Sequence, residues 1–263
     1  MKQILKCIGW VLLNFALQIV VQIAYCIPVA PELSAAELTG YIMDNILVIT
    51  LISNEIFIAI MLLTGKIKRH RLKERWGVFR PELKAALLPC VCAFLFSLGF
   101  AFLTFDTEAG NSLAIQNSVS YFSEKMPFAG IMLMIINLLV LAPVAEEMLC
   151  RGTMINGLKE KFSENTALVI SSVIFGAMHL MAGGPVLSVG CVIMGLLLGL
   201  TYKKTGSLVS AIIVHSAANL PDFILMALPP LSDPLRLGLT IGCIIASAVV
   251  LEFWYGFKKE KTK

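Results

Sequence analysis

The residues of this chain best suited to chemistry are two adjacent carboxylates in a long apolar segment. Glu146 and Glu147 lie near the end of the apolar residues 128–150. A charged residue at the centre of a bilayer costs roughly 2.5–3.5 kcal/mol on insertion scales, and less toward the interface. Such a pair persists where it faces a polar cavity, a partner charge or a reacting substrate. The function of the glutamates can therefore be inferred from the side chains that lie opposite them.

Two of the three histidines, together with one asparagine, lie in later apolar segments. His179 lies within residues 166–182, and both His215 and Asn219 lie within residues 207–228. Residues four apart share a helix face, so His215 and Asn219 point together. A lone intramembrane histidine is more often an interhelical hydrogen-bonding residue, but ionisable groups on three segments favour function. We predict one shared site.

Helical spacing assigns different roles to the two glutamates. Glu147 and Arg151 are four residues apart with the acid first, which is the favourable orientation for an ion pair. Glu146 lies about 100° around the same helix and is not paired with Arg151 in this way. We predict that Glu147 and Arg151 form a structural pair, and that Glu146 faces the histidines as a general base.

The composition is that of an integral membrane protein. Hydrophobic residues make up 58% of the 263 residues and charged residues 14%, whereas soluble domains carry about 25% charged residues. A bilayer-spanning helix needs about 20 apolar residues. We predict an all-α, polytopic transmembrane helical bundle that forms a single membrane domain over residues 1–263. Its eight or so spans are residues 8–29, 46–64, 85–105, 128–150, 166–182, 185–202, 207–228 and 236–256.

The distribution of basic residues predicts the orientation of the bundle. With eight spans and the N-terminus inside, all but two of the 21 Lys and Arg residues fall on the cytoplasmic side. The exceptions are Lys125 and Arg236. Cytoplasmic loops carry an excess of Lys and Arg, so both termini are expected in the cytoplasm. This bias also explains the net charge of +4, and we expect membrane lipid, and no nucleic acid, as a partner.

Depth restricts how the polar residues can meet. Glu146 lies near the cytoplasmic end of its predicted span, whereas His215 lies about 12 Å into span 207–228 at helical rise. His179 would lie deeper still. We therefore predict that the helix containing Glu146 continues to about Gly152, that the helix of His179 begins in the cytosol and tilts, or both.

Three motifs together resemble the CPBP intramembrane protease family. They are Glu146-Glu147-x-x-x-Arg151, Phe175-x-x-x-His179 and His215-x-x-x-Asn219. The family includes type II CAAX prenyl endopeptidases (Abi family members) and bacteriocin-processing or immunity proteins. Each motif alone is weak, but the ordered set is specific, and it covers residues 128–222 as the expected catalytic core. The resemblance implies a multi-pass protein of a bacterial cell membrane.

The resemblance also implies an activity, which is hydrolysis of a peptide bond inside the membrane. The expected partner is a peptide or protein substrate that is membrane-associated or lipidated. By the family pattern, Glu146 and His179 would activate the attacking water, and His215 and Asn219 would stabilise the oxyanion. Glu147, Arg151 and Phe175 would support the site. A carboxylate base and amide or imidazole donors suit this chemistry.

The residues leave the need for a metal open. Family naming often says metalloprotease, and Glu146, His179 and His215 form a plausible set of ligands for a divalent cation such as zinc. Against a metal, the HExxH motif of zincins is absent, and a metal-free glutamate mechanism is described for the family. The balance slightly favours chemistry without a metal. The seven cysteines form no CxxC pair or Cys/His cluster and are expected to be small buried hydrophobes.

Two other functional classes are compatible with the same residues. In a proton- or cation-coupled transporter the Glu, His and Asn cluster would form a relay, but transporters tend to show inverted repeats, and the chain has no matching halves. Gly183-Gly184-Pro185 could be a broken-helix feature of a transporter, although a tight turn is favoured. A non-proteolytic bacteriocin-immunity or regulatory membrane protein could retain the whole set of motifs.

Overall fold

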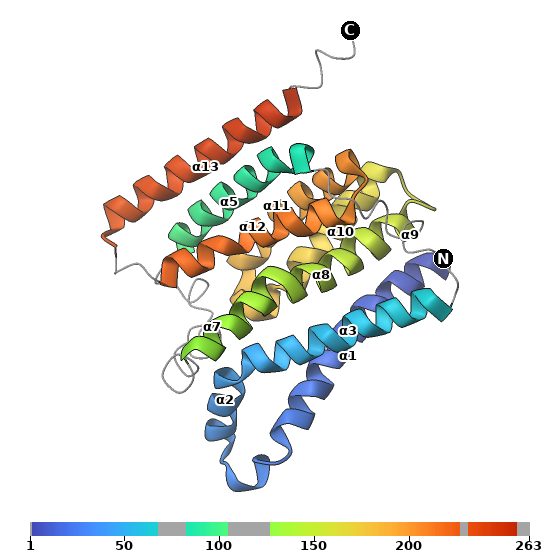
Figure 1. The fold of residues 1–263 in the computed structure, drawn as a ribbon, viewed down its shortest axis with the longest axis vertical. Helices are drawn as coiled ribbons and strands as arrows, with labels where there is room; N and C mark the ends of the chain where they lie inside the picture. The colour runs from blue at the N-terminus through green and yellow to red at the C-terminus, as the bar shows by residue number, and fades with distance from the viewer. Residues whose placement is uncertain (1, 68–82, 105–126, 227–230, 257–263) are drawn as a thin grey trace.

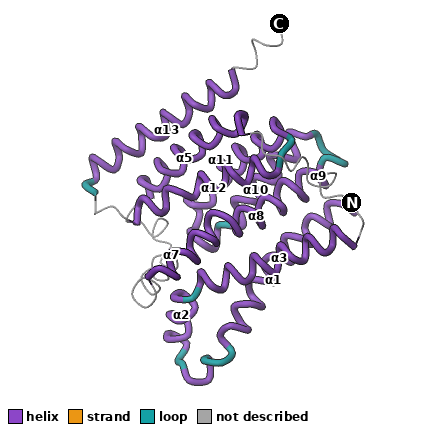
Figure 2. The backbone as a smooth tube through the Cα atoms, in the orientation of Figure 1, coloured by secondary structure: helices purple, strands orange, loops and turns teal. Residues whose placement is uncertain are grey.

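The computed structural model describes residues 2–67, 83–104, 127–226 and 231–256. These residues form helices joined by short turns, and none of them forms a strand (Figure 2). The prediction of an all-α bundle is therefore confirmed. Most of the basic segment 66–84, which contributes to the predicted orientation, lies outside the described residues.

Among the described residues, seven helices are long and apolar enough to cross a bilayer, whereas the sequence predicts about eight spans. The predicted segment 166–182 forms α10, Glu164–Met178, whose 15 residues extend about 22 Å at helical rise, less than the roughly 30 Å of a hydrocarbon core. The other long helices are α1 (Lys2–Cys26), α3 (Ile46–Ile67), α5 (Leu83–Thr104), α11 (Leu180–Thr205), α12 (Leu208–Met226) and α13 (Asp233–Gly256).

The helix that carries both glutamates is irregular along its length. It consists of α7 (Pro127–Ile136), a π-helical turn η2 (Asn137–Leu141), α8 (Ala142–Glu147), a second π-helical stretch η3 (Met148–Ile155) and α9 (Asn156–Leu158). The predicted extension of this helix to about Gly152 is confirmed, because it ends only at Leu158. Two π segments flank the short α8, and such bulges are frequent at functional sites.

Pro143 explains the contacts between this helix and α12. Proline has no amide hydrogen, so the carbonyls of Leu138 and Leu139, five and four residues earlier, cannot accept a bond from that position. Asn219 Nδ2 donates to the Leu138 carbonyl at 2.8 Å, and Ser216 Oγ donates to the Leu139 carbonyl at 2.7 Å. These two bonds fix the axial position of α12 against α8.

Polar contacts also hold the opposite side of η2. Asn54 Nδ2 on α3 donates to Asn137 Oδ1 at 3.2 Å, and Asn137 Nδ2 donates to Thr50 Oγ1 at 2.9 Å. Both asparagines are buried. The segment that precedes the glutamates is thus hydrogen-bonded to α3 on one side and to α12 on the other.

Helices α10 and α11 form a closely packed antiparallel pair. The chain reverses direction near the start of α11, where Gly183 and Gly184 have non-helical backbone angles, and Gly184 has a φ of 70° that glycine adopts without strain. A Cβ at Gly199 would lie 2.8 Å from the Leu168 Cγ atom, so a glycine is needed for this contact. At the N-terminal end of α10, the Lys159 ammonium donates a hydrogen bond to Glu164 at 2.8 Å. This bond holds the pKa of the exposed Glu164 carboxyl below its usual value.

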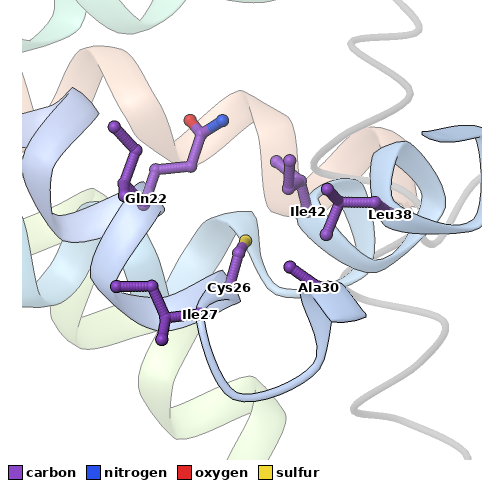
Figure 3. A pocket seen from close by; sticks show the side chains of 7 residues that line it. Gln22, Cys26, Ile27, Ala30, Leu38 and Ile42 are labelled. Atoms are coloured by element: carbon purple, nitrogen blue, oxygen red, sulfur yellow. The ribbon is translucent and has the colours of Figure 1, made fainter. Parts of the chain in front are cut away.

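The remaining helices lie on the two sides of this centre (Figure 1). On one side α13 packs along α5, and α5 packs against α12. On the other side α1 and α3 pair and contact the helix of the glutamates. Between α1 and the short α2 (Ala35–Asp44) lies an apolar cavity of about 230 Å³ (Figure 3). None of the predicted site residues lines this cavity.

Candidate active site

The structure brings three of the four predicted catalytic side chains together. Glu146 Oε2 lies 4.0 Å from His179 Nε2 and 3.7 Å from His215 Nε2. The residues come from α8, from the C-terminal end of α10 and from α12, respectively. Glu146 and His179 retain 21% and 25% of their side-chain exposure, so both side chains are partly accessible. Glu146 Oε2 itself is buried and has no hydrogen-bond partner.

Glu147 is the buried centre of a second polar group. Its Oε1 atom accepts from Arg151 Nη1 at 2.8 Å, which confirms the predicted pair, and both side chains are fully buried. The same oxygen lies 2.8 Å from His215 Nδ1. His215 Nε2 faces Glu146, as we predicted, and the bond of its Nδ1 atom to Glu147 is an additional contact. Arg151 Nη2 also donates to the Gly195 carbonyl on α11 at 2.7 Å.

Phe175 packs between the charged and the imidazole groups. Its ring centroid lies 4.8 Å from that of His179 and 5.6 Å from that of His215, the latter edge-on. The Arg151 guanidinium carbon lies 5.0 Å from the same centroid, within the range of a cation–π contact. The buried Phe175 ring thus packs against both imidazoles and against the guanidinium.

The hydrogen bonds of the two histidines define which nitrogen faces Glu146. His179 Nδ1 lies 2.8 Å from the Phe175 carbonyl, which can only accept, so Nδ1 carries the hydrogen. His215 Nδ1 faces a carboxylate already paired with Arg151, so it also donates. In a neutral imidazole the second nitrogen then holds a lone pair. Both Nε2 atoms are therefore directed at Glu146 as acceptors, or as donors when the ring is protonated.

Asn219 has a structural contact that the sequence did not reveal. One of its amide hydrogens is donated to the Leu138 carbonyl, which leaves the other for a ligand. Asn219 lies on the same face of α12 as His215, as predicted, and one turn further along.

Cys191 is a neighbour of the site that sequence reasoning missed. Its thiol, on α11, lies near the His179 imidazole, although the spacing of twelve residues gave no sign of a Cys/His cluster. The antiparallel packing of α10 and α11 brings the two residues together. The cysteines in the described residues are all free.

Glu146, His179 and His215 are side chains of the types that bind zinc, but the distances between their donor atoms do not suit a zinc ion. Two imidazole nitrogens and a carboxylate are a common catalytic zinc set, and the Nδ1 bonds to a carbonyl and a carboxylate are typical outer contacts of such ligands. A tetrahedral site with metal–ligand bonds of about 2.0–2.1 Å has ligands about 3.3 Å apart, less than the distances measured from Glu146. Within the described ranges, no three His, Cys, Asp or Glu side chains are arranged to hold a metal ion.

The comparisons with known proteins agree with the three motifs. Residues 128–221 match the family model of the type II CAAX prenyl endopeptidase Rce1-like proteins. Over this segment the chain is similar to Rce1-like proteins. It spans the helix of the glutamates, α10, α11 and most of α12. No curated protein and no solved structure matched the chain.

The family match and the apolar helices together support one interpretation, which is that the protein is an integral multi-pass membrane protein with the protease activity of CAAX-type endopeptidases. Every motif residue on which the resemblance was based lies within the matched segment. A peptide or protein substrate follows from the same family.

Proposed function

We propose that the protein is an intramembrane endopeptidase in which Glu146 activates a water molecule that attacks a peptide bond. The substrate is a peptide or protein that is membrane-associated or lipidated. The observation that carries this proposal is the buried Glu146 Oε2 atom, which has no partner of its own and lies between two imidazole Nε2 atoms. Separations of 3.7–4.0 Å suit polar groups bridged by a water molecule.

The attack requires a proton acceptor and a group that orients the water. Glu146 accepts one proton from the water, and the lone pair on His179 Nε2 accepts a hydrogen bond from its other hydrogen. The Phe175 carbonyl keeps the hydrogen of His179 on Nδ1, which supports this role. The hydroxyl oxygen adds to the carbonyl carbon of the substrate, and that carbonyl oxygen becomes an oxyanion.

The oxyanion is stabilised by donors on α12. His215 in its protonated form donates from Nε2, and Glu147 provides the counter-charge at Nδ1. The free amide hydrogen of Asn219 is the second donor. One oxyanion donor is typically worth about 2.7–4 kcal/mol of the barrier. When the intermediate collapses, the C–N bond breaks and Glu146 returns its proton to the leaving amine nitrogen.

Glu146→Gln is the sharpest test of this function. The amide keeps the shape of the side chain but cannot take a proton, and a general base contributes about 10²–10⁴-fold. We expect purified, reconstituted wild-type protein to cleave members of a randomised transmembrane peptide library, measured by mass spectrometry. The variant should lose at least about 100-fold in kcat with an unchanged thermal midpoint. Wild-type rates in Glu146→Gln would contradict the role of Glu146.

Chelation tests the part played by a metal. Because the ligand spacing does not suit direct coordination by all three groups, we expect cleavage to survive dialysis against 1,10-phenanthroline. The control is metal analysis of the dialysed protein, which must show that no stoichiometric zinc remains. Loss of activity that zinc alone restores would assign a metal to Glu146, His179 and His215.

A further inference from the structure

Asp222 is the charged residue of the membrane-spanning part of α12, and the reaction proposed above does not use it. It is the only Asp, Glu, Lys or Arg between Leu208 and Leu225. Ionisable side chains inside membrane segments are costly and are retained where they face an interior, a water-filled cavity or a partner. Within the described residues, its carboxylate has no hydrogen bond or ion pair.

Asp222 lies on the same side of α12 as His215. At 100° per residue, Ala211, His215 and Asp222 lie within an arc of about 40°. Ala211 is fully buried and His215 is 5% exposed, whereas Asp222 is exposed. Asn219, between His215 and Asp222, is half-buried. Exposure therefore rises along this stripe of α12 from His215 to the Asp222 carboxylate, while the neighbouring Ala218 and Pro221 stay buried.

The distance along this face corresponds to a short length of substrate. Seven residues of helix separate His215 from Asp222, or about 10 Å. An extended peptide covers the same distance in three residues, at about 3.3–3.6 Å each. A substrate that lies along α12 with its scissile bond at His215 thus places its third residue beside Asp222.

We propose that Asp222 is a specificity-determining residue that selects substrates with a cationic side chain, Lys or Arg, at the third residue from the scissile bond. This inference rests on the proposed endopeptidase function. The attraction between opposite charges is stronger at a membrane-embedded site than in bulk water. An acidic residue at the same position of the substrate is repelled.

The cleavage profile of the randomised peptide library tests this inference. For the wild type, we expect Lys and Arg to be enriched at least about fivefold at the third position on one side of the cleaved bonds. Asp222→Asn should bring the enrichment close to one while cleavage continues, and Asp222→Lys should favour Asp and Glu there. The control Asp233→Asn removes an exposed carboxylate of α13 that pairs with Arg236, and it should leave the profile unchanged.

The outcomes separate the two proposals. Cleavage by the wild type with a flat profile at both third positions, or an enrichment that persists in Asp222→Asn, overturns the role of Asp222 and leaves the endopeptidase intact. An absence of any cleavage by the wild type overturns the endopeptidase itself, and this inference with it.

Discussion

Glu147 accepts from two different side chains through the same carboxylate oxygen. Arg151 balances its charge, and His215 uses it to fix the tautomer of its ring. The i, i+4 rule predicted the first contact because both residues are on one helix. The second contact joins residues 68 apart in sequence, and no local rule could have found it. Glu146, one position earlier, is left free for the proposed chemistry.

Removing the charge of Glu147 should destabilise the protein, in contrast to the change at Glu146. Glu147→Gln leaves the Arg151 guanidinium buried without its counter-ion, which costs about 3–5 kcal/mol. We expect a lower thermal midpoint in detergent, measured by tryptophan fluorescence. Glu164→Gln is the control, because it breaks an exposed pair of the same length that is worth at most about 1 kcal/mol. Equal midpoints for Glu147→Gln and wild type would rule out a structural pair.

At the scale of the elements, Pro143 determines how α8 and α12 meet. The segment around the proline has two carbonyls without their helical donor, and α12 supplies Ser216 and Asn219 to them. This contact fixes the height of His215 relative to Glu146. The sequence showed the proline, but hydrophobicity and spacing could not predict the π segments, because these depend on polar groups of a distant helix.

Ser216→Ala tests this positioning. Loss of the hydroxyl leaves the Leu139 carbonyl without its interhelical donor, at a cost of about 1–3 kcal/mol, and should lower kcat because His215 is less well placed. Ser172→Ala is a matched control, since that buried serine donates to a carbonyl of its own helix. We expect unfolding and cleavage assays to show the larger effect for Ser216→Ala. Equal effects of the two changes would show that the contact with α8 has no special role.

At the scale of the whole molecule, the helices that contain the candidate active site lie at the centre of the bundle, and the remaining helices pack around them. The centre is the Rce1-like segment, and the α1–α3 and α5–α13 pairs cover its two sides. The short α10 extends about 22 Å, so a passage of this helix through the bilayer would require local thinning or shielding by the longer helices around it.

Topology is the prediction that belongs to this scale. From the excess of Lys and Arg in alternate loops we expect both termini in the cytoplasm, which would require α10 to cross the membrane together with the seven longer helices. Cysteines introduced at Lys2 and Lys263 of a cysteine-free variant should be protected from a membrane-impermeant maleimide in intact cells and labelled after lysis. A cysteine at Arg236 should be labelled in intact cells. Labelling of only one terminus before lysis would show an odd number of crossings.

The sequence by itself determined the helical class, the boundaries of the long helices to within eight residues, and the types of the candidate reacting groups. Apolar length and four-residue spacing are local properties, so they can be read along the chain. The tertiary structure decided which oxygen meets which nitrogen. His215 bonds Glu147, Asn219 supports Leu138, and Cys191 reaches His179 because separate helices pack at fixed heights, and that packing depends on contacts between residues far apart in the chain.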